Sequence, residues 1–183
     1  MKKILVLFFI FYTADLYAVE NNKILTFNED SAKYWQYISD RTMGGVSDGQ
    51  AFLDQDEGII FARLTGNVST DNNGGFIQLR TKLSFNNLNK EQGKLEGVRL
   101  NVRGNGETYH IFIRTSNDRS YRDYYSATFK AVDKWQIIDL PFVQFKHRYS
   151  NQILDGNDIR TFAIVAYGRE FVSDISVSKI IFY

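Results

Sequence analysis

The segment Val68–Lys82, VSTDNNGGFIQLRTK, is the most informative stretch of the chain for its fold. Its first half gathers asparagine, aspartate and two consecutive glycines, which accept left-handed backbone and hydrogen-bond their own turns. Its second half alternates between two sets of side chains, with Ile77 and Leu79 in one set and Gln78 and Arg80 in the other. Alternation with a period of two is typical of a half-buried strand. The segment therefore predicts a shaped turn that leads into a strand.

A second diglycine turn lies in Asp40–Gly49, DRTMGGVSDG, and it also precedes a strand-like stretch. Consecutive glycines reach backbone conformations that are closed to residues with a Cβ atom. We expect the two turns to be rigid loops whose shape is set by four glycines. These are Gly44, Gly45, Gly74 and Gly75.

Strand patterns continue through the rest of the chain, separated by clusters of turn residues. The further strand candidates are Ile59–Leu64, Leu95–Val102, Tyr109–Arg114, Tyr124–Val132, Trp135–Leu140, Thr161–Tyr167 and Ile175–Tyr183. The turn clusters are Asp54–Gly58, Asn86–Gly93, Gly104–Gly106, Ser116–Ser120 and Asp155–Asp158. Only Ser31–Tyr37, capped by Asp30, predicts a short helical turn. Many short strands at regular spacing predict an all-β antiparallel sandwich in one domain over residues 19–183.

The first 18 residues have the pattern of a secretory signal peptide. Two lysines precede the apolar run Ile4–Tyr12, and Leu16–Ala18 offers a cleavage site. Cleavage there would leave twenty basic and twenty acidic residues, so no electrostatic attraction to nucleic acid is expected. The apolar run is too short for an ordinary membrane-spanning helix. We expect a periplasmic or secreted protein with no stable membrane span after cleavage; an uncleaved anchor or a buried first strand is the alternative.

Composition and residue spacing predict that the protein has no metal site, no cofactor and no enzymatic activity. The chain has no cysteine and two histidines, His110 and His147, which are too far apart in sequence for a common zinc motif. No phosphate-binding loop and no nucleophile elbow is present. Asp48, Asp54 and Asp56 could share a calcium ion, but their spacing matches no calcium loop, so solvated turns are preferred.

Several motifs in order carry a resemblance to a known family. They include Asp40–Gly49, Gly66–Thr70 with Asn73–Phe76, and Val98–Gly106 with Tyr109. Trp35 precedes them, and Trp135, Leu140–Phe142 and Phe145 follow. In this combination the chain resembles the complex I intermediate-associated protein family, the thirty-kilodalton assembly-factor domain. The resemblance implies a galactose-binding-like jelly-roll β-sandwich and a non-enzymatic, chaperone-like role with a protein partner.

The diglycine loops are the first candidate surface for such a partner, because shaped loops on a rigid scaffold bind without a large ordering cost. The candidate contact residues are Asp40, Arg41, Asn72, Asn73 and Arg80. The structural alternative is that Asp40 and Asn73 only tie the two loops together, because such residues beside glycine commonly cap turns.

Carbohydrate recognition by the same fold is the second hypothesis. The polar-aromatic stretch after residue 114 supplies rings for stacking and planar side chains for hydrogen bonds. Its candidates are Tyr121, Arg122 and Tyr124, together with Trp135; a hairpin whose Tyr124 faces the core is the alternative. Four arginines recur on the polar faces of strand candidates. They would either line one concave face and meet an anion or acidic partner, or form cross-strand ion pairs. They are Arg80, Arg99, Arg103 and Arg114.

Overall fold

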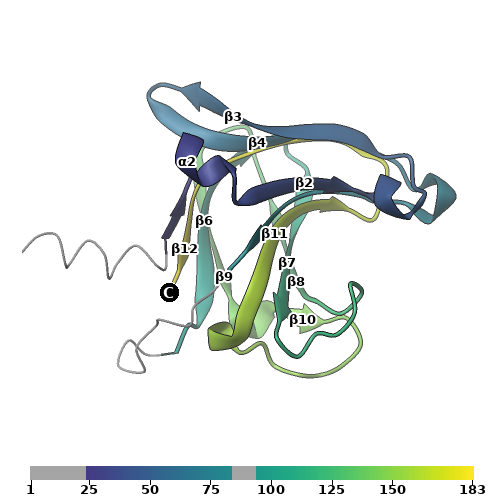
Figure 1. Ribbon diagram of the computed structural model, residues 1–183. Helices are drawn as coiled ribbons and strands as arrows, with labels where there is room; N and C mark the ends of the chain where they lie inside the picture. Colours follow the sequence, from purple (N-terminus) through teal and green to yellow (C-terminus); the bar gives the residue numbers. More distant parts are fainter. Residues whose placement is uncertain (1–23, 84–93) are drawn as a thin grey trace, which may run out of the picture.

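The computed structural model describes residues 24–83 and 94–183, and they form two antiparallel β-sheets packed face to face (Figure 1). The first sheet has the order β3 (Asp48–Asp56), β4 (Ile59–Val68), β12 (Phe171–Phe182), β6 (Gly97–Gly104) and β9 (Gln136–Pro141), with β1 (Ile24–Thr26) also paired to β12. The second has the order β10 (Lys146–His147), β8 (Tyr125–Lys130), β7 (Thr108–Thr115), β11 (Ile159–Tyr167), β5 (Phe76–Lys82) and β2 (Trp35–Ser39). The predicted β-sandwich is confirmed.

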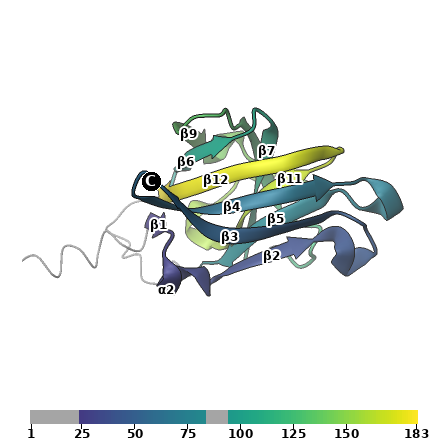
Figure 2. The same ribbon diagram turned by 90° about the horizontal axis from the view of Figure 1, so that it is seen from above.

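The alternation in the sequence explains which face of each strand is buried. In β6, Val98, Leu100 and Val102 are fully buried, while Arg99 and Asn101 lie on the outer face. Inward residues of the second sheet meet them across the sandwich, so one apolar core lies between the layers. Figure 2 shows β9, β6, β12, β4 and β3 side by side in that order, as expected for a continuous sheet.

Each strand expected from periodicity is present, with ends that differ by a few residues. The largest extensions are at the end of β4, which stops at Val68 instead of Leu64, and at the start of β12, which begins at Phe171 instead of Ile175. Three strands were not predicted, β1, β2 and β10, whereas β3 is the strand-like stretch expected after the turn in Asp40–Gly49. Two of these, β2 and β10, lie at the edges of the second sheet, where one-sided burial weakens the sequence pattern. The segment 1–18 and the turn cluster at residues 86–93 lie outside the described residues.

The predicted helical turn over Ser31–Tyr37 is wrong. The one α-helix of the described residues, α2, spans Glu29–Ala32, and Asn28 caps it rather than Asp30. The Asn28 Oδ1 accepts a hydrogen bond from the Ser31 backbone N–H at 2.8 Å, and Ser31 Oγ accepts one from the Asn28 N–H at 2.9 Å. The residues that follow belong to β2, because pairing with β5 satisfies their backbone groups along the sheet edge.

Candidate functional site

The two diglycine loops meet at a buried carboxylate. Asp40 begins the short 3₁₀ helix η2 (Asp40–Met43), and the second loop contains η3 (Asp71–Asn73). Figures 1 and 2 both show η2 and η3 side by side at one end of the molecule. The Asp40 carboxylate accepts hydrogen bonds from the backbone N–H groups of Ser47, Gly75 and Phe76, at 2.9, 2.6 and 3.1 Å. The Ser47 hydroxyl donates a fourth.

The position of the Asp40 carboxylate explains why each loop contains two consecutive glycines. Gly44 and Gly75 have positive φ values of 89° and 128°, which side chains rarely adopt. Gly45 and Gly74 instead lie against Asp40: an added Cβ would sit 2.4 Å from its Cγ at Gly45 and 2.5 Å from its Oδ2 at Gly74. In each pair one glycine permits the turn and the other makes room for Asp40.

Asp40 is therefore unavailable as a contact residue, which corrects the first hypothesis at this position. Its side chain is fully buried. Burial alone raises the pKa of the Asp40 carboxyl, but hydrogen bonds from the Ser47 hydroxyl and three backbone N–H groups outweigh burial and lower the pKa below its usual value. Asp40 remains charged and fixes both loops, as the structural alternative expected of it.

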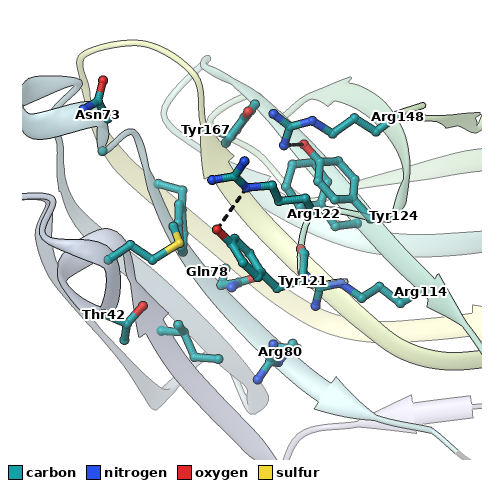
Figure 3. A pocket seen from close by; sticks show the side chains of 15 residues that line it. Thr42, Asn73, Gln78, Arg80, Arg114, Tyr121, Arg122, Tyr124, Arg148 and Tyr167 are labelled. Atoms are coloured by element: carbon teal, nitrogen blue, oxygen red, sulfur yellow. Dashed lines mark hydrogen bonds between the residues drawn. The ribbon is translucent and has the colours of Figure 1, made fainter. Parts of the chain in front are cut away.

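A groove of about 710 Å³ lies beside these loops, over the outer face of the second sheet. Figure 3 shows Thr42 and Asn73 on one side of it and Tyr124 and Arg148 on the other, with Arg122 between them. The volume is within the range of roughly 300–1,000 Å³ that is typical of ligand sites. The lining residues are Ile38, Thr42, Met43, Asn73, Gly74, Phe76, Gln78, Arg80, Phe112, Arg114, Tyr121, Arg122, Tyr124, Arg148 and Tyr167.

Aromatic side chains form one wall of the groove. Tyr124 stacks on Phe112 with ring centroids 4.1 Å apart, and Tyr167 meets Phe112 edge to face at 5.2 Å. Arg148 donates a hydrogen bond from Nη1 to the Tyr124 hydroxyl oxygen at 3.0 Å. Burial, followed by a hydrogen bond with Tyr167, raises the pKa of Tyr124 to about 12. Tyr124 is thus a buried, neutral phenol held by the Phe112 ring and the Arg148 guanidinium.

Arg114 builds the loop that closes the other end of the groove. Its guanidinium donates hydrogen bonds to the carbonyl oxygens of Tyr121 at 2.6 Å and Asp123 at 3.3 Å. Burial, and then the nearby charge of Arg80, lower the pKa of Arg114. Arg122 donates a hydrogen bond from Nε to the Tyr121 hydroxyl at 2.9 Å, and the Tyr121 ring remains largely exposed. Arg114 therefore holds an exposed tyrosine and arginine at the groove.

The structure brings together residues from both sequence hypotheses. Candidates that line the groove are Asn73, Arg80, Tyr121, Arg122 and Tyr124. Two other candidates, Arg41 and Asn72, lie on the loops outside the lining; Arg41 pairs with Asp48 at 3.4 Å, and Asn72 has a positive φ of 55°. The role of these residues in binding stays a prediction.

Trp135 lies on the opposite sheet, which corrects its place in the carbohydrate hypothesis. Its ring meets Phe61 edge to face at 5.4 Å and lies under Arg103. The proposed single face of four arginines is also wrong. Arg99 and Arg103 lie on the first sheet, where they pair with Asp139 at 2.6 Å and Asp56 at 2.8 Å. Of these four arginines, only Arg80 and Arg114 line the groove.

Sequence reasoning missed several lining residues. Phe76 and Gln78 share a strand face with Arg80, and Phe112 shares one with Arg114, so period-two alternation placed them correctly without revealing the groove. Arg148 and Met43 gave no such signal, because they lie outside the long strands.

No metal centre is found in the described residues, where no three His, Asp or Glu side chains gather in a metal-binding arrangement. The calcium alternative is not supported, because the three aspartates each pair with an arginine. Asp48 faces Arg41, Asp54 faces Arg63 at 3.7 Å and Asp56 faces Arg103. Across residues 24–83 and 94–183, no helix is long and apolar enough to cross a bilayer.

Fold and groove define a β-sandwich domain with a preformed, ligand-sized groove on one sheet. The chain belongs to the complex I intermediate-associated protein 30 family, whose model matches residues 25–171. The resemblance found in the sequence motifs is thereby confirmed. No curated protein matches the chain.

Solved structures to which the chain is similar include carbohydrate-binding modules and an exo-β-agarase. The chain is 15% identical to the family 11 carbohydrate-binding module from Clostridium thermocellum in complex with a β-1,3-1,4-mixed-linked tetrasaccharide, with a TM-score of 0.66 over 87% of this chain and 94% of that one. A second structure, the family 11 module of cellulase Lic26A-Cel5E from the same organism, gives 15% identity and 0.63 over 82% and 88%. An exo-β-agarase gives 7% identity and 0.59, over 88% of this chain and 25% of the agarase. At such identities these structures support the fold alone.

Proposed function

We propose that this chain is a non-catalytic, exported binding domain that holds a glycan chain in the groove of its second sheet. The observation that carries the proposal is the groove itself, which combines aromatic rings with planar hydrogen-bonding side chains on a rigid sheet face. The N-terminal signal-peptide pattern supports export. The tetrasaccharide bound to the family 11 module of the same fold supports the ligand class.

The lining suits the chemistry of sugars. A sugar ring has an apolar face of C–H groups, which packs against an aromatic ring, and an edge of hydroxyls, which needs donors and acceptors. Tyr121 offers the most exposed ring of the lining, with 58% of its surface accessible. Gln78 and Asn73 offer side-chain amides from the floor and the loop wall. Because Asp40 fixes the loop wall, little ordering is needed on binding.

The test is a glycan array on the purified protein, followed by calorimetry with the best ligand. Tyr121→Ala is expected to weaken binding by about tenfold or more, since stacked aromatic rings commonly dominate binding energy. Tyr34→Ala is the matched control, because Tyr34 is 63% exposed and lies outside the groove lining. Silence of the whole array, or equal loss in both variants, would contradict the proposal.

A protein partner is the second candidate function, favoured by membership of the assembly-factor family. Under this alternative the exposed loop residues Arg41, Asn72 and Asn73 contact the partner, and Met43, half exposed beside them, adds apolar surface. The fixed loop geometry serves a protein surface as well as it serves a sugar.

Affinity capture from the cell envelope, followed by reconstitution with the purified partner, tests this candidate. Arg41→Ala and Asn73→Ala are expected to weaken the reconstituted complex by about tenfold. Lys179→Ala, on the exposed face of β12, is the control. If both loop variants fold normally and bind the partner as wild type does, the loops are not its docking site.

A further inference from the structure

The arginines of this chain divide sharply into paired and unpaired groups. All eleven lie in the described residues. Six form ion pairs with carboxylates: Arg41, Arg63, Arg99, Arg103, Arg160 and Arg169. Within residues 24–83 and 94–183, no ion pair is found for Arg80, Arg114, Arg119, Arg122 and Arg148. Four of these five line the groove.

The outer faces of the two sheets therefore differ in how their charge is balanced. On the first sheet, Arg63 forms a two-pronged pair with Asp174 at 2.8 and 2.7 Å, and Arg99 forms one with Asp139 at 2.6 and 3.0 Å. On the second sheet, the described groove lining holds four arginines and no carboxylate. A nearly neutral protein thus concentrates positive charge in one concave site, where field lines are focused.

The groove arginines keep donors free for a ligand. Arg122 and Arg148 each donate one hydrogen bond to a tyrosine hydroxyl, out of five N–H donors in a guanidinium. Arg80 on β5 adds a charge on the floor of the groove, and Arg114 adds one from β7. Four separate segments converge to place these charges, although like charges repel. Asp118 and Asp123 lie near Arg114 and offset part of this repulsion, and an anion bound in the groove would offset more of it.

We propose that the groove selects an anionic glycan, one whose sugar residues carry carboxylate or sulfate groups. The proposal rests on the proposed glycan-binding function and names the class of sugar. Planar guanidinium groups bind both anions through paired N–H···O hydrogen bonds. The aromatic wall, with Tyr121 and the Phe112–Tyr124 stack, holds the sugar ring beside the charged group. Arg80 and Arg122 make the anion contacts, while Arg114 positions the Tyr121 loop.

Calorimetry with oligosaccharides of equal length tests the proposal. The three probes are a neutral β-1,3-1,4-glucan, a uronic-acid oligosaccharide and a sulfated oligosaccharide, with polyglutamate as a non-sugar polyanion. The expected result is that one acidic oligosaccharide binds about tenfold or more tightly than the neutral one, and that added salt weakens it. Comparison of the two acidic probes identifies the charged group.

Arg80→Gln and Arg122→Gln are the test variants, because neither arginine holds a backbone carbonyl. Each is expected to reduce the ratio of the affinity for the acidic oligosaccharide to that for the neutral one by about tenfold. Arg99→Gln, on the opposite sheet, is the control and is expected to bind as wild type does. Circular dichroism confirms that each variant is folded.

The outcomes distinguish a failure of anion selection from a failure of the proposed glycan binding. If the neutral glucan binds as well as the acidic probes and the Gln variants change nothing, anion selection is overturned while glycan binding stands. If no oligosaccharide binds, both fail. Binding of polyglutamate alone also overturns the inference and favours the protein-partner function.

Discussion

Replacement of Asp40 by asparagine tests whether one buried carboxylate sets the shape of both diglycine loops. The substitution keeps the size of the side chain and removes its charge. One Asp40 oxygen, Oδ1, accepts from the Ser47 N–H, and the other, Oδ2, accepts from the Ser47 hydroxyl and from the Gly75 and Phe76 N–H groups. Asparagine has one oxygen and one NH₂ group, so its NH₂ must face at least one backbone N–H donor.

The magnitude follows from this count of donors. The most favourable rotamer leaves one buried N–H unpaired, at a cost of about 1–3 kcal/mol. The remaining bonds lose the strength that the charge adds, because charge-assisted bonds are roughly twice as strong as neutral ones. We expect Asp40→Asn to lower the free energy of unfolding by roughly 3 kcal/mol in total, a large part of the about 5–15 kcal/mol typical of a domain.

Urea unfolding followed by circular dichroism at neutral pH measures this loss. Asp48→Asn is the matched control, because Asp48 directly follows the same loop, at the start of β3, and its ion pair with Arg41 is exposed. The control is expected to cost about 0.5 kcal/mol or less, as exposed pairs do. If Asp40→Asn comes within about 1 kcal/mol of Asp48→Asn, the assigned role of the carboxylate is refuted.

The pH dependence gives a second readout of the same carboxylate. The pKa of Asp40 is lower in the folded protein than its ordinary value of 3.8, so the folded state binds fewer protons than the unfolded chain. The stabilisation is therefore complete above that value and is lost as the pH falls through the lower, folded-state pKa. The difference in stability between wild type and Asp40→Asn should shrink below about pH 4. A difference that stays constant from neutral to acid pH would contradict this assignment.

Three further predictions concern other parts of the molecule. Gly74→Ala should cost about 2 kcal/mol or more in urea unfolding, because its Cβ would meet the Asp40 carboxylate; no measurable cost would contradict the close approach. Ultraviolet titration should show Tyr109 and Tyr124 ionising at a pKa of about 12, since burial disfavours the phenolate. The variants Tyr109→Phe and Tyr124→Phe should each remove the ionisation of one tyrosine from this high-pH part of the titration curve. Trp135→Phe should leave glycan affinity within about twofold of wild type, because Trp135 packs on the opposite sheet. A larger loss would contradict the assignment of the glycan site to the second sheet.

Periodicity in the sequence determined most of the β-sandwich. Strands such as β5, β6 and β7 bury alternate side chains in one core, and the same alternation is legible in the sequence. The edge elements β2 and β10 could not be predicted this way, because β10 has only two residues and the short strand β2 fully buries none of its large apolar side chains. The family could also be predicted from the sequence, because its motifs are defined by the order of residues along the chain.

The purpose of the diglycine motifs and the place of the groove were decided only by the tertiary structure. The sequence indicated that glycines shape two loops, but Asp40 and Gly74 are distant along the chain and meet only when the sheets have formed. Arg80 and Arg122 likewise converge from different segments, while Arg99, similar to them in sequence pattern, faces the other way and is neutralised by Asp139. Alternation fixes which side of a strand a residue occupies, whereas strand order in the sheet fixes its neighbours and hence its chemistry.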